Sequence, residues 1–110
     1  MFVQCVFTDN LRDGLHDATL NGTSADVWKG WDQGRYPVFG KTGTAQRPSR
    51  PNDQSWYACY VPDRARPIVV VATVEDGGWG ATAAAPIART IVSQWFGEPV
   101  KFVAGSSHTL

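Results

Sequence analysis

The most chemically suggestive stretch of the chain is residues 40–44, Gly-Lys-Thr-Gly-Thr. An ammonium, two hydroxyls and glycines in consecutive positions can bind an anion. One site with such a run is the end of a phosphate-binding loop, G-x-x-x-x-G-K-[ST]. Arg35 stands five residues before Gly40 where that motif has glycine, and a polar loop with Pro48 follows where it requires a helix. These two departures exclude the phosphate-binding loop.

The same residues can instead form an edge strand that receives an extended peptide. Alternate side chains of a strand share a face, so the Lys41 ammonium would lie beside Gly43, which has no side chain to obstruct a ligand. A peptide could pair with the backbone of such a strand and extend the sheet. The candidate substrate-binding residues are therefore Lys41, Thr42, Gly43 and Thr44.

Acyl transfer would use these residues in distinct ways. Lys41 can place a positive charge near the peptide's terminal carboxylate and tune the proton transfer of a neighbouring serine. The hydroxyls of Thr42 and Thr44 can donate hydrogen bonds to that carboxylate. The backbone N–H of Thr44 can point at the oxyanion of the intermediate, where losing one such donor costs about 3 kcal/mol of barrier. Lys41 and Thr44 are the candidate catalytic residues.

Helices and strands around this segment must position it. A helix is expected over residues 10–20, where Leu11, Leu15 and Ala18 recur at helical spacing, and a loop over 21–35. Strands are expected over 36–45, 55–61 and 67–74. The run 68–71 is apolar at every position, which predicts a central strand covered on both faces.

A second helix is expected after the glycine turn 77–80. Pro86 falls in its first turn, and Gly97 and Pro99 end it. The apolar positions that repeat at helical spacing are Ala84, Ile87 or Ala88, Ile91 and Trp95. Residues 98–110 are expected to be a poorly ordered tail. The predicted fold class is α+β, an antiparallel sheet flanked by helices.

Composition limits the remaining possibilities. The chain has 110 residues, 43% of them apolar, enough for one small domain. Ten basic and ten acidic residues cancel, so no overall field would attract nucleic acid or an anionic membrane, and no run approaches the ~18 apolar residues of a membrane span. Cys5 and Cys59 lack the spacing of a zinc or redox site. No cofactor or metal is expected, and Cys59 is expected to be a buried thiol.

The segments around residues 40–44 resemble the C-terminal part of the transpeptidase domain of the class B penicillin-binding proteins. Residues 41–46, Lys-Thr-Gly-Thr-Ala-Gln, are similar to the third signature motif of that family. Residues 13–15 and 21–24 resemble the helix and the "GTA" segment upstream of that motif. Residues 56–62 resemble its next strand, which commonly reads W-x-x-G-[YF]-x-P.

The end of the chain narrows this resemblance to one branch. Residues 74–80, followed by 84–89, are similar to the V-E-x-G-G-x-G…A-x-P-x-A-R ending of the elongation-type branch, penicillin-binding protein 2. The resemblance implies that Glu75 and Asp76 lie in a turn and are not a catalytic pair. The resemblance covers roughly residues 8–97, and the order and spacing of its segments make it specific.

The resemblance implies a serine D,D-transpeptidase that cross-links peptidoglycan stem peptides ending in D-Ala-D-Ala and is acylated by β-lactams. It implies that residues 1–97 are the C-terminal portion of the transpeptidase domain, with its last three strands, at the extracytoplasmic face of the bacterial cell membrane. No serine of the chain begins Ser-x-x-Lys or Ser-x-Asn. The nucleophile is therefore expected on the remainder of the transpeptidase domain, and the chain alone is expected to be inactive.

Two other functions remain open. The chain could be a truncated, non-catalytic fragment, or a stand-alone module that binds D-alanyl peptides or β-lactams without turning them over. The apolar residues 68–74 and the row Ile87, Ile91 and Trp95 supply more apolar surface than 110 residues can cover. Exposed apolar patches are therefore expected on the isolated chain.

Overall fold

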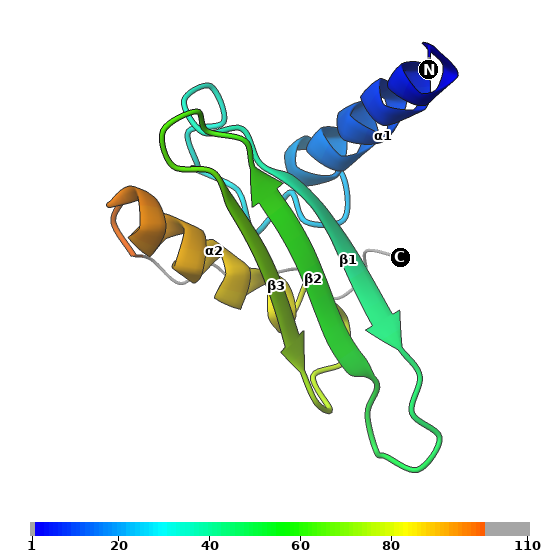
Figure 1. Cartoon of the computed structure of the whole chain (residues 1–110). Coiled ribbons are helices and arrows are strands. Elements are labelled where there is room, and N and C mark those ends of the chain that lie inside the picture. The colour runs from blue at the N-terminus through cyan, green and yellow to red at the C-terminus, as the bar shows by residue number, and fades with distance from the viewer. Residues whose placement is uncertain (1, 101–110) are drawn as a thin grey trace.

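The chain forms two helices and one small sheet. The computed structural model describes residues 2–100, with side chains from residue 10 onward. A helix comes first, three strands follow, and a second helix comes after the sheet (Figure 1). The elements are α1 (Phe2–Leu20), β1 (Phe39–Ala45), β2 (Gln54–Val61), β3 (Ile68–Val74) and α2 (Ala84–Phe96). The predicted α+β class is confirmed, and residues 101–110 of the expected tail lie outside the described residues.

The three strands form an antiparallel sheet in the order β1-β2-β3. Thr42 is opposite Tyr57, which in turn is opposite Ala72. Strand β1 begins at Phe39 rather than at Tyr36 as predicted, because the N–H of Val38 donates to Gln33 Oε1 (2.9 Å) instead of to a neighbouring strand.

One face of the sheet packs on α2 and encloses the core. The side chains of β2 alternate between buried and more exposed, as expected of a sheet with one covered face. Helix α1 packs against β1, where the ring of His16 lies 4.9 Å from that of Phe39. The main core cluster comprises Val27, Trp28, Val38, Tyr57, Cys59, Val61, Val70, Ala72, Ala84, Ala85, Ala88, Val92 and Phe96.

Helix α2 confirms the predicted helix and its end. Gly97 adopts a left-handed conformation (φ 69°), and its N–H donates to Gln94 O (3.2 Å). The N–H of Glu98 donates to Ser93 O (2.9 Å), so the two bonds form a Schellman cap. The buried row of α2 includes Ala88 and Val92, and small residues there let the helix approach the sheet closely.

Helix α1 is longer than predicted. It begins at Phe2 rather than at residue 10, and it continues through Asp9 and Asn10, two residue types that often cap a helix. Asp and Asn cost only about 0.7 kcal/mol each in a helix interior relative to Ala. This cost is small enough for the helix to continue through them.

Strand β3 is an edge of the described sheet, so the prediction of a central strand covered on both faces is wrong. Val69 is 74% exposed and Val71 is 62% exposed. Helix α2 covers the opposite face, where Val70 and Ala72 are buried. The expected exposed apolar surface is thereby confirmed, and Ile87, Ile91 and Trp95 of α2 are exposed as well.

Candidate functional site

The predicted site residues lie on β1, at the other edge of the described sheet. Lys41 is opposite Ala58 and Gly43 is opposite Trp56, so both lie on the face that α2 does not cover. Thr42 and Thr44 alternate with them. Lys41 and Thr44 are exposed, while Thr42 and Gly43 are half-buried. Because β2 is the only strand of the described sheet beside β1, every second residue of β1 directs its N–H and C=O groups away from the sheet.

The Lys41 ammonium lies beside a shallow groove between β1 and α1. The groove has a volume of about 440 Å³ and is partly apolar, with Leu11 and Leu15 of α1 in its wall and Thr23 near Lys41. Lys41 Nζ donates to the carbonyl oxygen of Thr42 at 2.9 Å, an exposed contact that a ligand carboxylate can replace.

The end of α1 and the residues that follow it are hydrogen-bonded to β1 and to the residue just before it. The hydroxyl groups of Thr23 and Thr42 lie 3.2 Å apart. Thr19 Oγ1 donates to Val38 O (2.8 Å), just before β1 begins. Sequence reasoning connected residues 21–24 with the site only through the family resemblance, and these contacts give the physical basis for that connection.

A buried polar cluster under β1 was not predicted from the sequence. Trp28 Nε1 donates to Tyr57 Oη (2.9 Å), and the Tyr57 hydroxyl donates to Ser24 Oγ (3.1 Å). Ser24 Oγ donates in turn to Ala18 O (3.1 Å) at the end of α1. Burial raises the pKa of Tyr57 to about 12, although its hydrogen bonds to Ser24 and Trp28 act in the opposite direction. The cluster therefore holds a neutral tyrosine under the site strand.

Gly40 is required by this cluster. A Cβ at this position would lie 2.2 Å from Tyr57 Oη and 3.3 Å from Cys59 Cβ. At Gly43, in contrast, the nearest atom to an added Cβ would be Trp56 Cβ at 3.4 Å, an ordinary contact. The first glycine of residues 40–44 therefore makes room for the core, and the second leaves room on the exposed face.

The turn after β3 closes against the sheet beneath Gly43. A Cβ at Gly80 would lie 2.7 Å from Gly43 O and 2.4 Å from Trp56 O, so only glycine allows the turn to approach this closely. Ser55 Oγ donates to Trp79 O (3.0 Å) and accepts from the N–H of Ala84 (3.1 Å). The glycine turn of the sequence thus acts as a support for the site strand.

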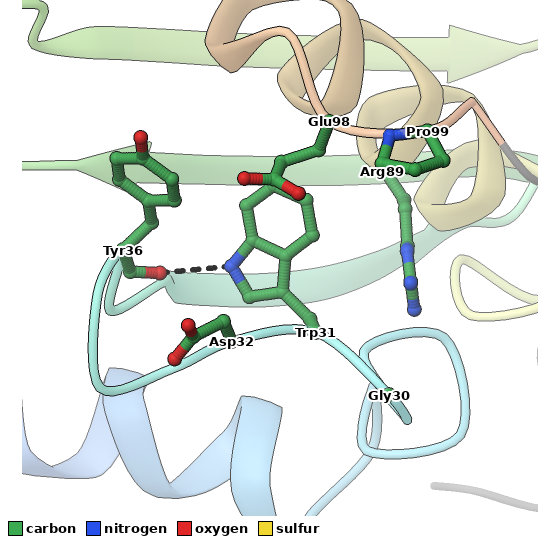
Figure 2. Close-up of a pocket in the computed structure, with 7 residues that line it drawn as sticks. All are labelled: Gly30, Trp31, Asp32, Tyr36, Arg89, Glu98 and Pro99. Carbon is green, nitrogen blue, oxygen red and sulfur yellow. Dashed lines mark hydrogen bonds between the residues drawn. The ribbon is translucent and has the colours of Figure 1, made fainter.

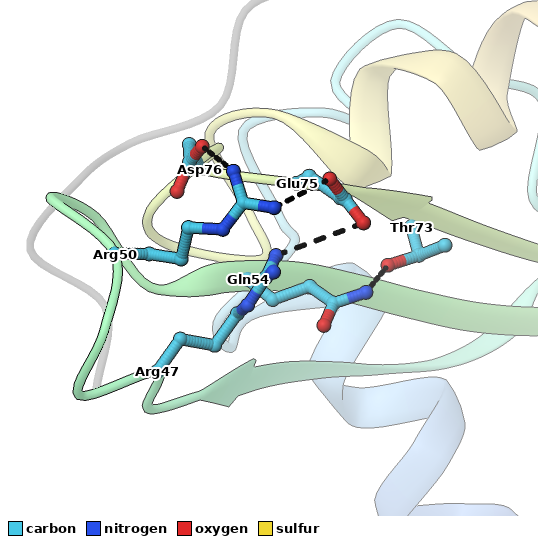
Figure 3. A network of polar contacts seen from close by, with 6 residues as sticks. All are labelled: Arg47, Arg50, Gln54, Thr73, Glu75 and Asp76. Carbon is cyan, nitrogen blue, oxygen red and sulfur yellow. Dashed lines mark hydrogen bonds and ion pairs between the residues drawn. The ribbon is translucent and has the colours of Figure 1, made fainter.

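An ion-pair cluster joins this turn to the loop after β1 (Figure 3). Arg47 Nη1 lies 3.8 Å from Glu75 Oε1, and Arg50 lies 4.0 Å from Glu75 and 3.7 Å from Asp76. The N–H of Gly78 donates to Asp53 O (2.9 Å). Glu75 and Asp76 follow β3 in a turn, as expected, and both form ion pairs with arginines of the loop after β1.

Arg89 fixes α2 to the loop behind the site. It is 7% exposed, and its Nη1 donates to the carbonyl oxygens of Val27 and Lys29, the latter at 2.8 Å. Burial lowers the pKa of Arg89. Its side chain lines a cavity of about 200 Å³ with Trp31 and Glu98 (Figure 2). Lys41 does not line this cavity, so Arg89 belongs to the scaffold behind β1 and not to the candidate site itself.

The buried serines near the strands are unsuited to act as nucleophiles. Ser24 and Ser55 are buried, and each hydroxyl donates to a backbone carbonyl. Cys59 is buried as predicted, and burial raises the pKa of its thiol to about 12, which keeps it protonated at neutral pH. Cys5 lies outside the described side chains.

Neither a metal site nor a membrane-spanning helix is found in the described part of the chain. Its His, Cys, Asp and Glu side chains nowhere gather in threes as a metal ion would require. Among the described residues, no helix is both long and apolar enough to cross a bilayer.

Comparison with known proteins identifies the family. The model of the penicillin-binding protein transpeptidase domain matches residues 7–93. The chain is also similar to the D,D-transpeptidase domain of a peptidoglycan glycosyltransferase from Eggerthella lenta, with 31% identity, a TM-score of 0.49 and 76% of this chain covered. That match spans 19% of the solved chain, and no curated protein matched.

The family match covers well over half of the chain, from α1 to most of α2. The chain therefore belongs to the penicillin-binding protein transpeptidase family. It contains part of the transpeptidase domain. The strand with the Lys-Thr-Gly-Thr sequence is the β1 edge described above. Within the described sheet, this edge carries the Lys41 ammonium, the hydroxyls of Thr42 and Thr44 and backbone groups that β2 does not pair.

Proposed function

We propose that the chain is the substrate-binding, C-terminal segment of a peptidoglycan D,D-transpeptidase, of class B and of the elongation type called penicillin-binding protein 2. The order of residues 74–80 and 84–89 supports this branch. The substrates would be stem peptides ending in D-Ala-D-Ala, and β-lactams would acylate the same site. The reaction would take place at the extracytoplasmic face of the bacterial cell membrane.

The observation that carries the proposal is the open β1 edge with Lys41 beside it. A stem peptide would lie along β1 as an added strand. Its terminal carboxylate would lie at the strand edge, between the face with Lys41 and the face with Thr42 and Thr44, and would accept hydrogen bonds from Lys41 Nζ and from the two hydroxyls. The N–H of Thr44 would stabilise the oxyanion that forms when a serine attacks the penultimate carbonyl carbon.

The attacking serine would come from the remainder of the transpeptidase domain. The match to the solved transpeptidase spans about a fifth of that chain, and this sequence has no Ser-x-x-Lys. Attack would release the terminal D-alanine and leave an acyl-enzyme. The amine of a second stem peptide would then take the acyl group and complete the cross-link. The two parts would thus divide the reaction, with nucleophile on one and carboxylate recognition on the other.

Labelling with a fluorescent penicillin tests the proposal. The 110-residue chain alone is expected to form no covalent adduct. A longer polypeptide that also contains the Ser-x-x-Lys part of the domain should be labelled, and Lys41→Ala should slow that labelling roughly tenfold or more, the loss of a charge-assisted hydrogen bond. Lys29→Ala is the matched control, because Lys29 is an exposed lysine that does not line the Lys41 groove.

Three results would contradict the proposal. A stable acyl-enzyme on the 110-residue chain would show that the nucleophile is not missing. A Lys41→Ala variant that is labelled normally but melts at a lower temperature would make the role of Lys41 structural. Tight, saturable binding of a D-Ala-D-Ala peptide to the monodisperse chain in calorimetry would favour the stand-alone binding module.

A further inference from the structure

The cavity at the C-terminal end of α2 combines opposite charges with aromatic rings. Its volume is about 200 Å³, which is below the roughly 300–1,000 Å³ of sites for drug-sized ligands. Figure 2 shows a guanidinium and two carboxylates around the indole ring of Trp31. The charged groups belong to Arg89, Asp32 and Glu98, and Tyr36 adds a second ring. The lining therefore fits a small ligand that carries charge.

The Arg89 guanidinium has unused hydrogen-bond donors although the side chain is only 7% exposed. Its Nη1 donates to the carbonyl oxygens of Val27 and Lys29. Nε is buried with no hydrogen-bond partner among the described residues, and Nη2 makes no hydrogen bond to them either. These two nitrogens form the fork through which an arginine binds a carboxylate with two parallel bonds. Because a buried donor without an acceptor is costly, a carboxylate at this fork would be stabilising.

The two carboxylates of the cavity do not neutralise Arg89. In the described part of the chain, Glu98 forms an ion pair only with Arg35 Nη1, at 3.9 Å, and Asp32 forms none. Asp32 Oδ1 accepts the N–H of Arg35 (3.1 Å), and a carboxylate has further lone pairs for other donors. The Arg35 side chain is 67% exposed, so its pair with Glu98 is weak and a ligand cation can replace it.

We propose that this cavity binds a free α-amino acid with a small apolar side chain. The carboxylate of the ligand accepts hydrogen bonds from Nε and Nη2 of Arg89, and its ammonium donates to Asp32 and Glu98. The apolar side chain lies against the rings of Trp31 and Tyr36. A zwitterion complements both kinds of charge in the cavity, whereas a simple anion would face two carboxylates and a simple cation would face a buried guanidinium.

The amino-acid site is separate from the candidate substrate site. The cavity shares no lining residue with the groove beside Lys41. The inference therefore does not rest on the proposed transpeptidase function, and the failure of either leaves the other standing. D-Alanine, which the proposed reaction would release, belongs to the ligand class of the cavity. D-Alanine and L-alanine are accordingly the probes for a test of binding.

Titration of the 110-residue chain with each alanine enantiomer, followed by NMR, tests the proposal. At least one enantiomer should shift the Trp31 and Asp32 amides and the Trp31 indole N–H saturably at about millimolar concentration, because so small a ligand makes few contacts. Propionate and ethylamine each carry one of the two charges and should bind about tenfold more weakly or less. The proposal is overturned if neither enantiomer binds, if propionate binds as well as alanine, or if the shifts are confined to residues 42–44 beside Lys41.

Two neutral substitutions of the same shape test the carboxylates. Glu98→Gln and Asp32→Asn should each weaken alanine binding about tenfold, because a charge-assisted hydrogen bond becomes a neutral one. The asparagine keeps an oxygen that can accept the N–H of Arg35, so the loop should stay folded. Glu75→Gln and Asp26→Asn are the matched controls, since both side chains are exposed and neither lines the cavity. Their affinity for alanine should equal that of the parent chain.

Arg89→Lys tests the guanidinium. The substitution keeps a positive charge but removes the fork, and it should weaken alanine binding more than either carboxylate variant does. Circular dichroism checks that the variant folds, since Arg89 also holds the carbonyl groups of Val27 and Lys29. If it does not fold, the carboxylate variants decide. Parent-like binding by a folded Arg89→Lys variant, or by both carboxylate variants, contradicts the proposal.

Discussion

The two edges of the sheet have opposite chemistry although they belong to one three-stranded framework. The β1 edge carries a lysine, two threonines and a glycine, and the β3 edge carries exposed valines. In the part of the chain that the structure describes, both edges present unpaired backbone groups. A polar edge with a glycine can exchange water for a small ligand reversibly. An apolar edge is stabilised most when another protein surface buries it permanently. The side chains therefore favour the β1 edge for the proposed substrate and the β3 edge for a covering protein surface.

Alkaline pH should produce the largest effect, because it disrupts the core that supports both edges. Burial raises the pKa of Cys59 from 9.0 and that of Tyr57 from 10.0, each to about 12. The unfolded chain releases these protons first, so the stability present below pH 9 is lost as the pH rises toward 12. We expect a loss of roughly 4 kcal/mol by pH 11 in urea titrations.

Two substitutions separate the thiol from the tyrosine in this effect. Cys59→Ala should remove the part of the pH dependence that begins near pH 9 and leave the part that begins near pH 10. If the stability of the parent chain were the same at pH 8 and pH 11, the burial of both groups would be contradicted.

Substitution of the two glycines of the site should affect stability very differently. Gly40→Ala forces the Tyr57 ring to move and should lower the free energy of unfolding by about 2–3 kcal/mol. Gly43→Ala should change it by less than about 1 kcal/mol, because its Cβ meets only Trp56 at a normal distance. Chemical denaturation measures both. Equal destabilisation by the two substitutions would remove the distinction between the packed and the open side of β1.

The ion pairs at the end of the β1 edge should have the smallest effect. Glu75 and Arg50 are largely exposed, so Arg50→Ala should cost less than about 1 kcal/mol in low salt. The difference between variant and parent should vanish in 1 M NaCl, where charges are screened within about 3 Å. A difference that persists in high salt would indicate packing of the Arg50 side chain rather than charge.

The helices and strands were predicted from the sequence more accurately than the neighbours that each of them has in the fold. The alternation of side chains in a strand is a local signal, and so are Pro86 at the start of α2 and Gly97 at its end. The three strands and α2 therefore lie close to where they were predicted. Whether β3 is a central or an edge strand depends on which strands lie beside it, and an apolar run in the sequence does not determine this. The start of α1 was predicted too late in the chain for a related reason. Asp and Asn often cap helices, but they are also tolerated inside one.

The supports of the candidate site were the least predictable part. The residues 41–44 were identifiable from their types and spacing. Their connection to Tyr57, Trp28 and Ser24 depends on side chains that are 29 and 33 positions apart in the sequence. Such contacts leave no periodic pattern. Gly40, the second residue of β1, was the only local sign that a large side chain packs there.

Amide shifts in NMR spectra of the 110-residue chain test the central claim most directly, that β1 is the edge that receives a peptide's carboxyl terminus. At millimolar concentration, a peptide ending in D-Ala-D-Ala should shift the amides of Thr42, Gly43 and Thr44 and leave those of Val69 and Val71 unchanged. The same peptide with an amidated C-terminus should lose most of this effect. Shifts confined to the β3 edge, or equal shifts from the carboxylate and the amide, would contradict the account.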